Sequence, residues 1–384
     1  MRRFIPVFAA SLFLSIHFGS TLYFHSSFLN DYFKPNTVSL LFLLGALGNI
    51  SLFLFAPKLI QRFGKRPFLF FSLIFTAAST FIFAFTITTR PTIVLAFIVY
   101  SSFLPMVYYC LDIFLEELST NAKTGEIRGI YLTVFNAGIV FGPLILVILA
   151  KEGPPTKFLY LIAGLLLIPP SLLALFSFKS RLPKAHNPYH PSLRLPFGNW
   201  WRAKNIRRVT LARLVLESFF AFMVIYTPIY LHTGLGFSWS ELGIIFTVML
   251  LPFVLFEWPA GELADRLYGE KEIMSAGFFI TGISLLVMPF IGKVFWVWMA
   301  ILFISRVGAS LIEAMTDSYF FKHINARDTG LISIFRLTRS TGFVFGAAIG
   351  TLTLNLFSFE KIFFVAAVVV FFGLKESLFL KDTL

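Results

Sequence analysis

Ionisable side chains interrupt several of the long apolar runs in this sequence of 384 residues. Glu217 and Arg306 each stand near the middle of such a run, and Arg213 precedes Glu217 by one helical turn, on the same helix face. A charge at the centre of a helix in lipid costs about 2.5–3.5 kcal/mol, so such residues pair or face water and usually serve function. We expect Glu217 to take and release protons, with Arg213 or Arg306 setting its proton affinity and Arg306 as its partner or as a substrate anchor. A static ion pair is the alternative interpretation.

Two more apolar runs carry polar side chains that suit the lining of a cavity. His17 lies in a polar stripe of the first run, and an imidazole titrates near physiological pH. Tyr100 and Ser102 occupy the fourth run. We expect these side chains to face a substrate cavity, and a hydrogen-bonded packing role is the alternative for His17.

The composition indicates the environment in which these residues act. Hydrophobic residues make up 57% of the chain and charged residues 13%, and the mean hydropathy is +0.83. Because a soluble domain has about 25% charged residues and a helix crosses a bilayer with about 20 apolar ones, we predict an all-α integral membrane protein. Its twelve transmembrane helices are expected at residues 4–29, 37–60, 67–87, 91–116, 127–150, 157–178, 208–231, 240–260, 272–292, 294–317, 329–355 and 361–380.

Basic residues outside these runs gather in alternate connections. Arg62, Lys123, Arg207 and Lys322 are among the many that would share one side of the membrane, whereas the other connections hold few. Loops rich in Lys and Arg stay in the cytoplasm, so we expect both termini there, in a cell membrane, with an uncleaved first helix. The net charge of +13 is then a topology signal, and we expect no nucleic-acid partner.

The two halves of the sequence are related by an internal repeat. A constant offset of 204 residues holds from the second span through the fifth and pairs, for example, Gly138 with Gly342. Parallel repeats of this kind place a substrate near the bilayer midplane, between the halves. We predict two pseudo-symmetric six-helix bundles, at residues 1–178 and 208–384, joined by a cytoplasmic linker at residues 179–207.

The loop after the eighth span carries a family motif. It reads Gly261-Glu262-Leu263-Ala264-Asp265-Arg266-Leu267-Tyr268-Gly269-Glu270-Lys271. This segment resembles the G-x-L-A-D-R-x-G-R-K signature of the major facilitator superfamily, with one extra residue before the second glycine. The first-half copy has Pro57 in place of the first glycine and Gln61 in place of the aspartate. The resemblance covers the whole chain and implies secondary transport of a small-molecule substrate.

In that superfamily the motif loop acts as a latch, and the resemblance implies the same here. Asp265 would reach the start of the fifth span near Arg128, because a carboxylate is attracted to a helix N-terminus. Gly261 would permit close helix packing. The other motif residues assigned to the latch are Arg266, Gly269 and Lys271. A loop that only fixes topology is the alternative.

Charged residues nearer the cytoplasmic ends of the spans are expected to form gate and latch pairs, because they lie at shallow depth within reach of one another. These residues are Asp112, Glu313, Asp317, Arg336 and Arg339.

The fifth span shows a second family pattern in Gly129, Gly138, Gly142 and Pro143. It resembles the G-x8-G-x3-G-P motif of drug:proton antiporters, which implies proton-coupled efflux of an amphipathic compound. Glycines four apart also allow close helix packing, so ordinary packing is the alternative. The same spacing recurs in the eleventh span at Gly342, Gly346 and Gly350.

The sequence holds no constellation typical of an enzyme. There is no H-E-x-x-H motif, no Walker A glycine loop and no cysteine cluster, and the single Cys110 lies in an apolar run. We therefore expect a monomeric transporter that uses protons and needs neither a metal nor a cofactor. An uptake permease and a non-transporting membrane sensor or scaffold remain the alternative functions.

Overall fold

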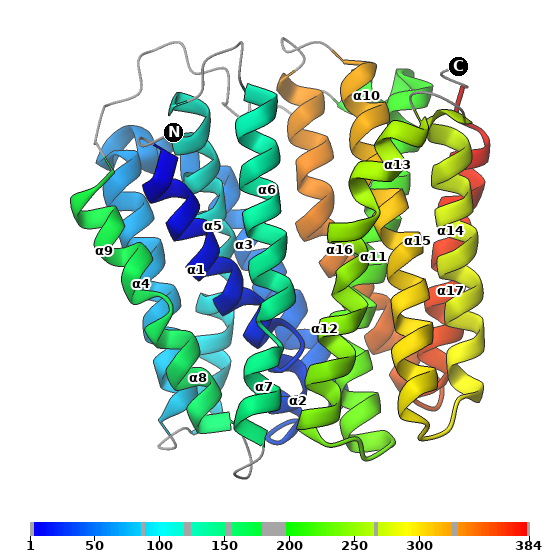
Figure 1. Cartoon of the computed structure of the whole chain (residues 1–384), viewed down its shortest axis with the longest axis horizontal. Coiled ribbons are helices and arrows are strands. Elements are labelled where there is room, and N and C mark those ends of the chain that lie inside the picture. The colour runs from blue at the N-terminus through cyan, green and yellow to red at the C-terminus, as the bar shows by residue number, and fades with distance from the viewer. Residues whose placement is uncertain are drawn as a thin grey trace. The chain divides into compact units, whose positions relative to one another are not determined.

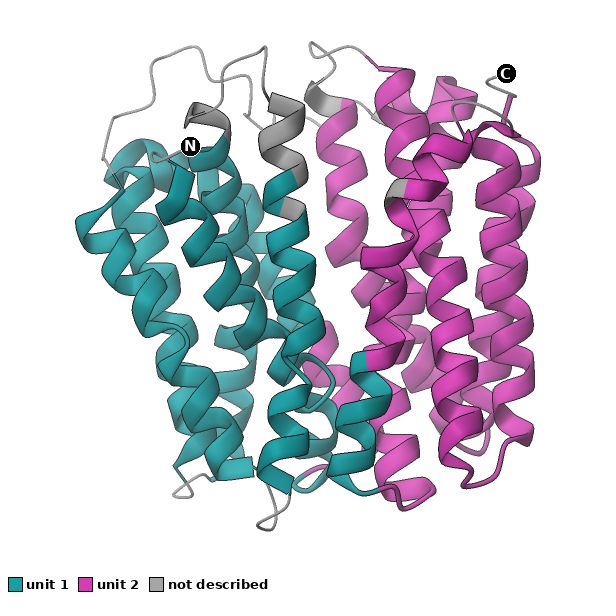
Figure 2. Ribbon diagram, viewed as in Figure 1, with its two compact units in different colours: residues 1–32, 44–187, 238–247 teal, residues 33–43, 188–237, 248–384 magenta. Residues whose placement is uncertain are grey.

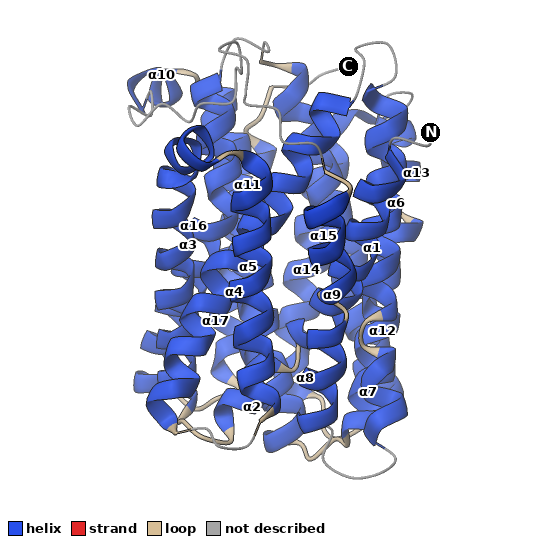
Figure 3. Ribbon diagram, turned by 90° about the vertical axis from the view of Figure 1, so that its left-hand side faces the viewer, coloured by secondary structure: helices blue, strands red, loops and turns tan. Residues whose placement is uncertain are grey.

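The computed structural model of the chain describes most of the sequence. The described residues are 4–85, 89–118, 124–150, 156–178, 197–264, 268–324 and 329–381. Over these ranges the chain folds into helices and contains no β-strand (Figure 3). Helices suit an apolar chain in lipid, because an α-helix satisfies its backbone groups within its own segment.

The first half contains six helical segments that match the predicted spans to within a few residues (Figure 1). They are α1 (Ile5–Leu22) with α2 (His25–Asn30), α3 (Pro35–Phe63), α4 (Lys65–Ala84), α5 (Arg90–Leu118), α6 (Thr124–Phe141) with α7 (Leu144–Leu149), and α8 (Thr156–Leu165) with α9 (Ile168–Phe176). Proline explains two of the three interruptions: Pro143 precedes α7, and Pro169 lies in the first turn of α9.

The second half repeats this arrangement after a short helix. The elements are α10 (Phe197–Arg202), α11 (Lys204–Ile229) with a π-helical turn (Tyr230–Gly234), α12 (Trp239–Leu255), α13 (Glu257–Leu263), α14 (Gly269–Val287), α15 (Phe295–Lys322), α16 (Thr329–Leu356) and α17 (Lys361–Leu378). The short helix α10 carries the Trp200-Trp201 pair, and the Arg207 guanidinium carbon lies 4.7 Å from the Trp201 ring centroid.

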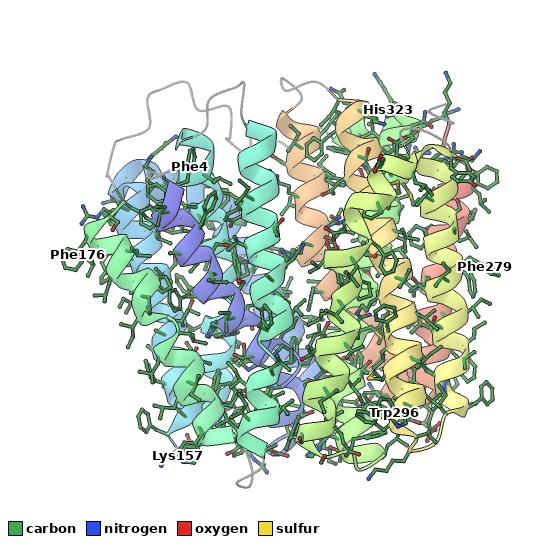
Figure 4. All side chains as sticks on the ribbon, in the orientation of Figure 1. Phe4, Lys157, Phe176, Phe279, Trp296 and His323 are labelled. Carbon is green, nitrogen blue, oxygen red and sulfur yellow. The ribbon has the colours of Figure 1, made fainter. Side chains whose placement is uncertain are left out.

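Among the described residues, nine helices are long and apolar enough to cross a membrane. Large apolar side chains cover their outer surfaces: Phe176 is 82% exposed and Trp296 69%. Figure 4 shows the side chains of Phe176 and Phe279 pointing away from the helices of their own units. Such surfaces need lipid as their solvent, and the chain is a multi-pass membrane protein.

The helices form two compact units, coloured in Figure 2. Unit 1 comprises Met1–Tyr32, Leu44–Asn187 and Ser238–Thr247, and unit 2 comprises Phe33–Leu43, Pro188–Phe237 and Val248–Leu384. In unit 1, α1 packs on α6, and α4 packs on α5 and α8. In unit 2, α11 packs on α16, and α14 packs on α15 and α17. The shared pattern of neighbours follows the internal repeat and confirms the prediction of two pseudo-symmetric six-helix bundles.

The units do not divide strictly at the predicted linker, because two helices contribute to both. The first turns of α3, within Phe33–Leu43, belong to unit 2, where the Asn36 side chain donates a hydrogen bond to that of Asn355. The first turns of α12, within Ser238–Thr247, belong to unit 1. The predicted boundaries at residues 178 and 208 stay a prediction, since residues 179–196 of the linker lie outside the described residues.

Two glycines start corresponding helices in a conformation that other residues avoid. Gly64 precedes α4 with φ of 90°, and Gly269 begins α14 with φ of 75°. These values explain the second glycine of each motif loop. The residue that follows is charged and buried in both halves: Lys65 lies 4.9 Å from the Phe114 ring centroid, and Glu270 accepts hydrogen bonds from α15.

Candidate functional site

The middle of α11 carries the charge on which the predicted function depends. This helix packs against α15, α16 and α17, so little of its surface is free. Glu217 lies near its midpoint and is 2% exposed. A carboxylate at this depth is removed from bulk water and needs a partner inside the protein.

Arg213, one turn earlier on α11, supplies that partner. Its Nε and Nη2 atoms each lie 2.9 Å from Glu217 Oε1. The same guanidinium reaches α15, with Nη2 2.8 Å from Glu313 Oε1 and Nη1 3.1 Å from Asp317 Oδ1. The exposed fraction of the carboxyl side chains rises from 3% at Glu217 through 28% at Glu313 to 52% at Asp317. The cluster therefore runs from the interior of unit 2 to its surface.

Two further charged residues lie within electrostatic range of these groups. Glu257, the first residue of α13, interacts electrostatically with the Arg213 guanidinium and with both α15 carboxylates. Arg339 of α16 acts on Glu217. Counted with Glu257 and Arg339, the cluster holds four carboxylates and two guanidinium groups, and full ionisation would leave a surplus of two negative charges. A cluster of this composition can accept a proton while its arginines remain paired.

Close contact with α16 fixes this part of α11. A Cβ added to Gly342 would collide with the Cβ atom and backbone of Glu217, so the two helices approach only because that residue is glycine. Phe335, one to two turns earlier on α16, places its ring centroid 6.0 Å from the Arg213 guanidinium carbon. A cation over an aromatic face is stabilised by the ring, so α16 positions both members of the ion pair.

Arg306 occupies a separate place in unit 2. It is fully buried on α15, and its guanidinium carbon lies 4.9 Å from the ring centroid of Phe219 on α11. Of the two arginines expected as the partner of Glu217, the structure pairs Arg213 with it. The role of Arg306 as a substrate anchor stays a prediction.

In unit 1 the structure joins two of the predicted cavity residues. His17 Nδ1 lies 2.9 Å from the carbonyl oxygen of Ala163 and must carry a hydrogen, because a carbonyl only accepts. His17 Nε2 lies 3.1 Å from the Tyr100 hydroxyl, which is 3.0 Å from the Thr21 hydroxyl. All of these groups are buried. The chain of bonds is satisfied whether the histidine is neutral or charged, since the hydroxyl hydrogens can reverse direction.

The other predicted residues lie elsewhere. Ser102 packs beside Gly48, where α5 meets α3 in unit 1. Glu313 and Asp317, expected among the gate residues, form ion pairs with Arg213, and their role in a gate stays a prediction. Asp112 of α5 and Arg336 of α16 are half-buried on the helices where they were expected.

The motif loop departs from the prediction at its first glycine. A Cβ added to Gly261 would meet no described atom within 4 Å, so the close packing expected there is not found in the described part of the chain. Lys271 lies on α14 with its Nζ 4.0 Å from Glu272. The latch contact itself stays a prediction, because Asp265, Arg266 and the side chain of Arg128 lie outside the described residues.

The glycines of the fifth and eleventh spans lie where helices approach closely. A Cβ added to Gly138 or Gly142 would collide with α1, at Ser15 and at Gly19. Gly346 faces Ser218 and Ala221 of α11, and an added Cβ at Gly350 would strike the Tyr226 hydroxyl. Pro143 lies in the interruption between α6 and α7, directly before the first residue of α7. This geometry agrees with the packing interpretation of the pattern.

Sequence reasoning missed two functional candidates. Glu257 falls inside the predicted span 240–260, so the criterion that found Glu217 would have found it as well. His25, near the end of the first predicted span, is buried among aromatic rings in unit 1. Within the described residues, no group of three or more His, Cys, Asp or Glu side chains is arranged to hold a metal ion.

Comparisons with known proteins place the chain in a family. The model of the major facilitator superfamily matches residues 3–246 and 214–382. No curated protein matches the sequence. The crystal structure of the nucleoside transporter NupG matches with a TM-score of 0.79 at 13% identity, covering 98% of this chain and 99% of that one. The crystal structure of a NupG mutant matches with a TM-score of 0.81 at 11% identity, with the same coverage of both chains.

The fold recurs in a transporter of another kind. An auto-inhibited peptide transporter of the POT family matches with a TM-score of 0.77 at 12% identity, covering 98% of this chain and 96% of that one. Identities this low show the shared fold alone. The family model covers nearly the whole sequence, and the helix order and paired bundles agree with it. The chain therefore belongs to the major facilitator superfamily of secondary transporters.

Proposed function

We propose that this protein moves a small solute across the membrane by alternating access and that Glu217 carries the coupling proton. The observation that supports the proposal is a buried carboxylate at the middle of α11, held by an arginine that also binds two other carboxylates. Intramembrane ionisable residues are expensive and are retained for function. The surplus of acidic groups adds to this case, because a purely structural ion pair needs only one partner.

The shared arginine supplies a physical route to proton coupling. A buried carboxylate holds a proton more firmly when no cation is near, and an adjacent guanidinium favours the ionised form. Arg213 can leave Glu217 and still satisfy its charge with Glu313 and Asp317 on α15. A swing of the Arg213 side chain away from Glu217 and toward α15 would therefore favour proton uptake at Glu217, and re-pairing would favour release. Water access from alternate sides would turn this change into transport.

The direction, the substrate and the orientation form the finer part of the proposal. The pattern at Gly138, Gly142 and Pro143 favours efflux, and the aromatic residues with few charges favour an amphipathic compound. Both termini would lie in the cytoplasm, with the protein in the cell membrane as a monomer. Nucleosides and peptides, named for the structural neighbours, belong in the first substrate screen.

The experiment that tests the proposal uses Glu217→Gln in proteoliposomes. The amide keeps the shape but cannot ionise, so we expect substrate exchange to continue while accumulation driven by a pH gradient falls to the level without a gradient. The matched control is Glu360→Gln, an exposed carboxylate just before α17, which should respond like the unaltered protein. Uphill transport with unchanged pH dependence in Glu217→Gln would remove Glu217 from the mechanism. The absence of any solute flux in the unaltered protein would favour the sensor or scaffold.

A further inference from the structure

The break between α1 and α2 lies in a segment of unit 1 that is expected to be within the membrane. Tyr23 and Phe24 separate the two helices, and neither residue is a glycine or proline that would explain an interruption. The first three residues of α2 are His25, Ser26 and Ser27, which are 4%, 0% and 2% exposed. Three consecutive polar residues are therefore buried directly after the break.

Aromatic rings enclose the imidazole of His25. Its ring centroid lies 4.6 Å from that of Tyr100, and 5.7 Å from those of Phe83 and Phe97, all in edge-on arrangements. Tyr160 of α8 lies 5.4 Å away and places its hydroxyl 2.9 Å from His25 Nδ1. Every group in contact with the ring is neutral, and an isolated buried charge would be costly, so the imidazole is neutral.

The bond to Tyr160 settles which nitrogen of His25 carries the hydrogen. Tyr160 is fully buried, and among the described residues its hydroxyl has one hydrogen-bond partner, His25 Nδ1. We assign the phenol as the donor to Nδ1, because the opposite direction would leave both the phenol hydrogen and the Nε2 acceptor unpaired. A neutral imidazole has a single N–H group, which leaves that group at Nε2.

The Nε2–H group of His25 has no partner among the described residues, and neither do the hydroxyls of Ser26 and Ser27. The polar side chains one to two turns earlier on α1 do have partners: both nitrogens of His17 are bonded, and Ser20 donates to the carbonyl oxygen of His17. A buried donor without an acceptor is destabilising, and such groups in natural proteins usually mark a bound water or a ligand.

We infer that the break between α1 and α2 is a binding site for a neutral oxygen acceptor, a hydroxyl or carbonyl group that receives a hydrogen bond from His25 Nε2–H beside the faces of aromatic rings. Ser26 and Ser27 offer further donors and acceptors on the same turn. The oxygen can come from an ordered water or from the transported solute, and the second source rests on the proposed transport function. A broken helix with unpaired polar groups is the form that binding sites take within membranes.

The first test needs no knowledge of the solute. Protein labelled with ¹⁵N-histidine in lipid is studied by solid-state NMR, and the His25 signal is identified by its loss in His25→Asn or, if that variant does not fold, by its cross peaks to Ser26. We expect the hydrogen on Nε2 and a cross peak from this hydrogen to water or to an oxygen-bearing ligand. A hydrogen on Nδ1, or an Nε2–H shifted upfield by a ring face with no such cross peak, would overturn the site.

The second test separates the two sources of the oxygen. Thermal unfolding in detergent is measured with uridine, which is rich in hydroxyl and carbonyl oxygens, and with tetraphenylphosphonium, which has none. If the solute supplies the oxygen, uridine should raise the melting temperature of the unaltered protein and of His25→Gln, whose amide reaches the Nε2 position. His25→Asn, which reaches only the Nδ1 position, should bind uridine about tenfold more weakly.

Each result of this comparison decides a separate question. If uridine does not raise the melting temperature of the unaltered protein, uridine is excluded as the source of the oxygen. The evidence for the site is then the NMR cross peak to water. Equal uridine shifts in His25→Asn and His25→Gln would reject a contact between the solute and Nε2. Tetraphenylphosphonium should affect all three proteins alike. Failure of all solutes to cross the membrane would refute the proposed transport function. The NMR result would still test the His25 site, because it does not depend on transport.

Discussion

Arg213 and His17 are ionisable side chains inside the two units, and their partners differ in chemistry. Arg213 is charged and is shared by three carboxylates on two helices. His17 is held by neutral partners, a carbonyl oxygen and a tyrosine hydroxyl. Loss of a residue from a charged cluster leaves a charge without compensation, whereas loss from a neutral network leaves only an unpaired dipole. The two sites should therefore respond very differently to substitution.

Replacing Arg213 with methionine should lower the stability of the protein sharply. The change leaves the buried Glu217 carboxylate without its arginine, and breaking a buried ion pair typically costs about 3–5 kcal/mol. Thermal unfolding in detergent measures the loss. The second substitution in Arg213→Met/Glu217→Gln should restore much of it, because the isolated charge is gone.

The matched control for this prediction is Lys204→Met, on the exposed first turn of the same helix. This substitution should change the free energy of unfolding by no more than about 0.5 kcal/mol, as for most surface substitutions. A double variant as unstable as Arg213→Met alone would show that the arginine contributes packing and not charge compensation.

At the scale of elements, the apolar pattern predicts where the helices lie. An apolar run in lipid must be helical, and the span boundaries accordingly agree to within a few residues. The break at Pro143 follows from proline chemistry. The break at Tyr23 and Phe24 could not be predicted, because neither residue disfavours a helix and the interruption depends on what packs around it.

The candidate site was predictable only where its residues share a helix. Arg213 and Glu217 stand one turn apart, so their pairing follows from helix geometry. The inclusion of Glu313 and Asp317 depends on the rotation of α15 against α11, which the sequence of either helix does not specify. The pairing of His25 with Tyr160 joins residues 135 positions apart and was beyond pattern reasoning for the same reason.

Substitution of the glycine between α11 and α16 should disturb both packing and coupling. In Gly342→Ala the new methyl group meets the Cβ atom of Glu217, so α16 must move outward. Overpacking of this kind costs about 1–3 kcal/mol, and we expect a lower melting temperature together with weaker proton coupling. The control is Gly198→Ala on α10, where an added Cβ meets nothing within 4 Å. Equal melting temperatures for the two variants would show that α11 and α16 are not held by this contact.

For the whole molecule, membership of the superfamily settles the architecture and leaves orientation to be measured. In a background where the buried Cys110 is replaced by alanine, His190→Cys should react only with a maleimide that crosses the membrane. Arg90→Cys, at the exposed start of α5, should react with an impermeant maleimide added outside intact cells. The expectation follows from the excess of basic residues in the connections on one side. The reverse labelling pattern would invert the topology.

The exchange of helix ends between the units sets an order of events during synthesis. Domains generally fold as they emerge, N-terminal part first, but unit 1 includes Ser238–Thr247, which is translated after all six of its own helical segments. Unit 2 in turn includes Phe33–Leu43, which is made long before the rest of that unit and must wait for it. The contacts of unit 1 are therefore complete only after residues 238–247 have been synthesised, which is well after its own helical segments have left the ribosome.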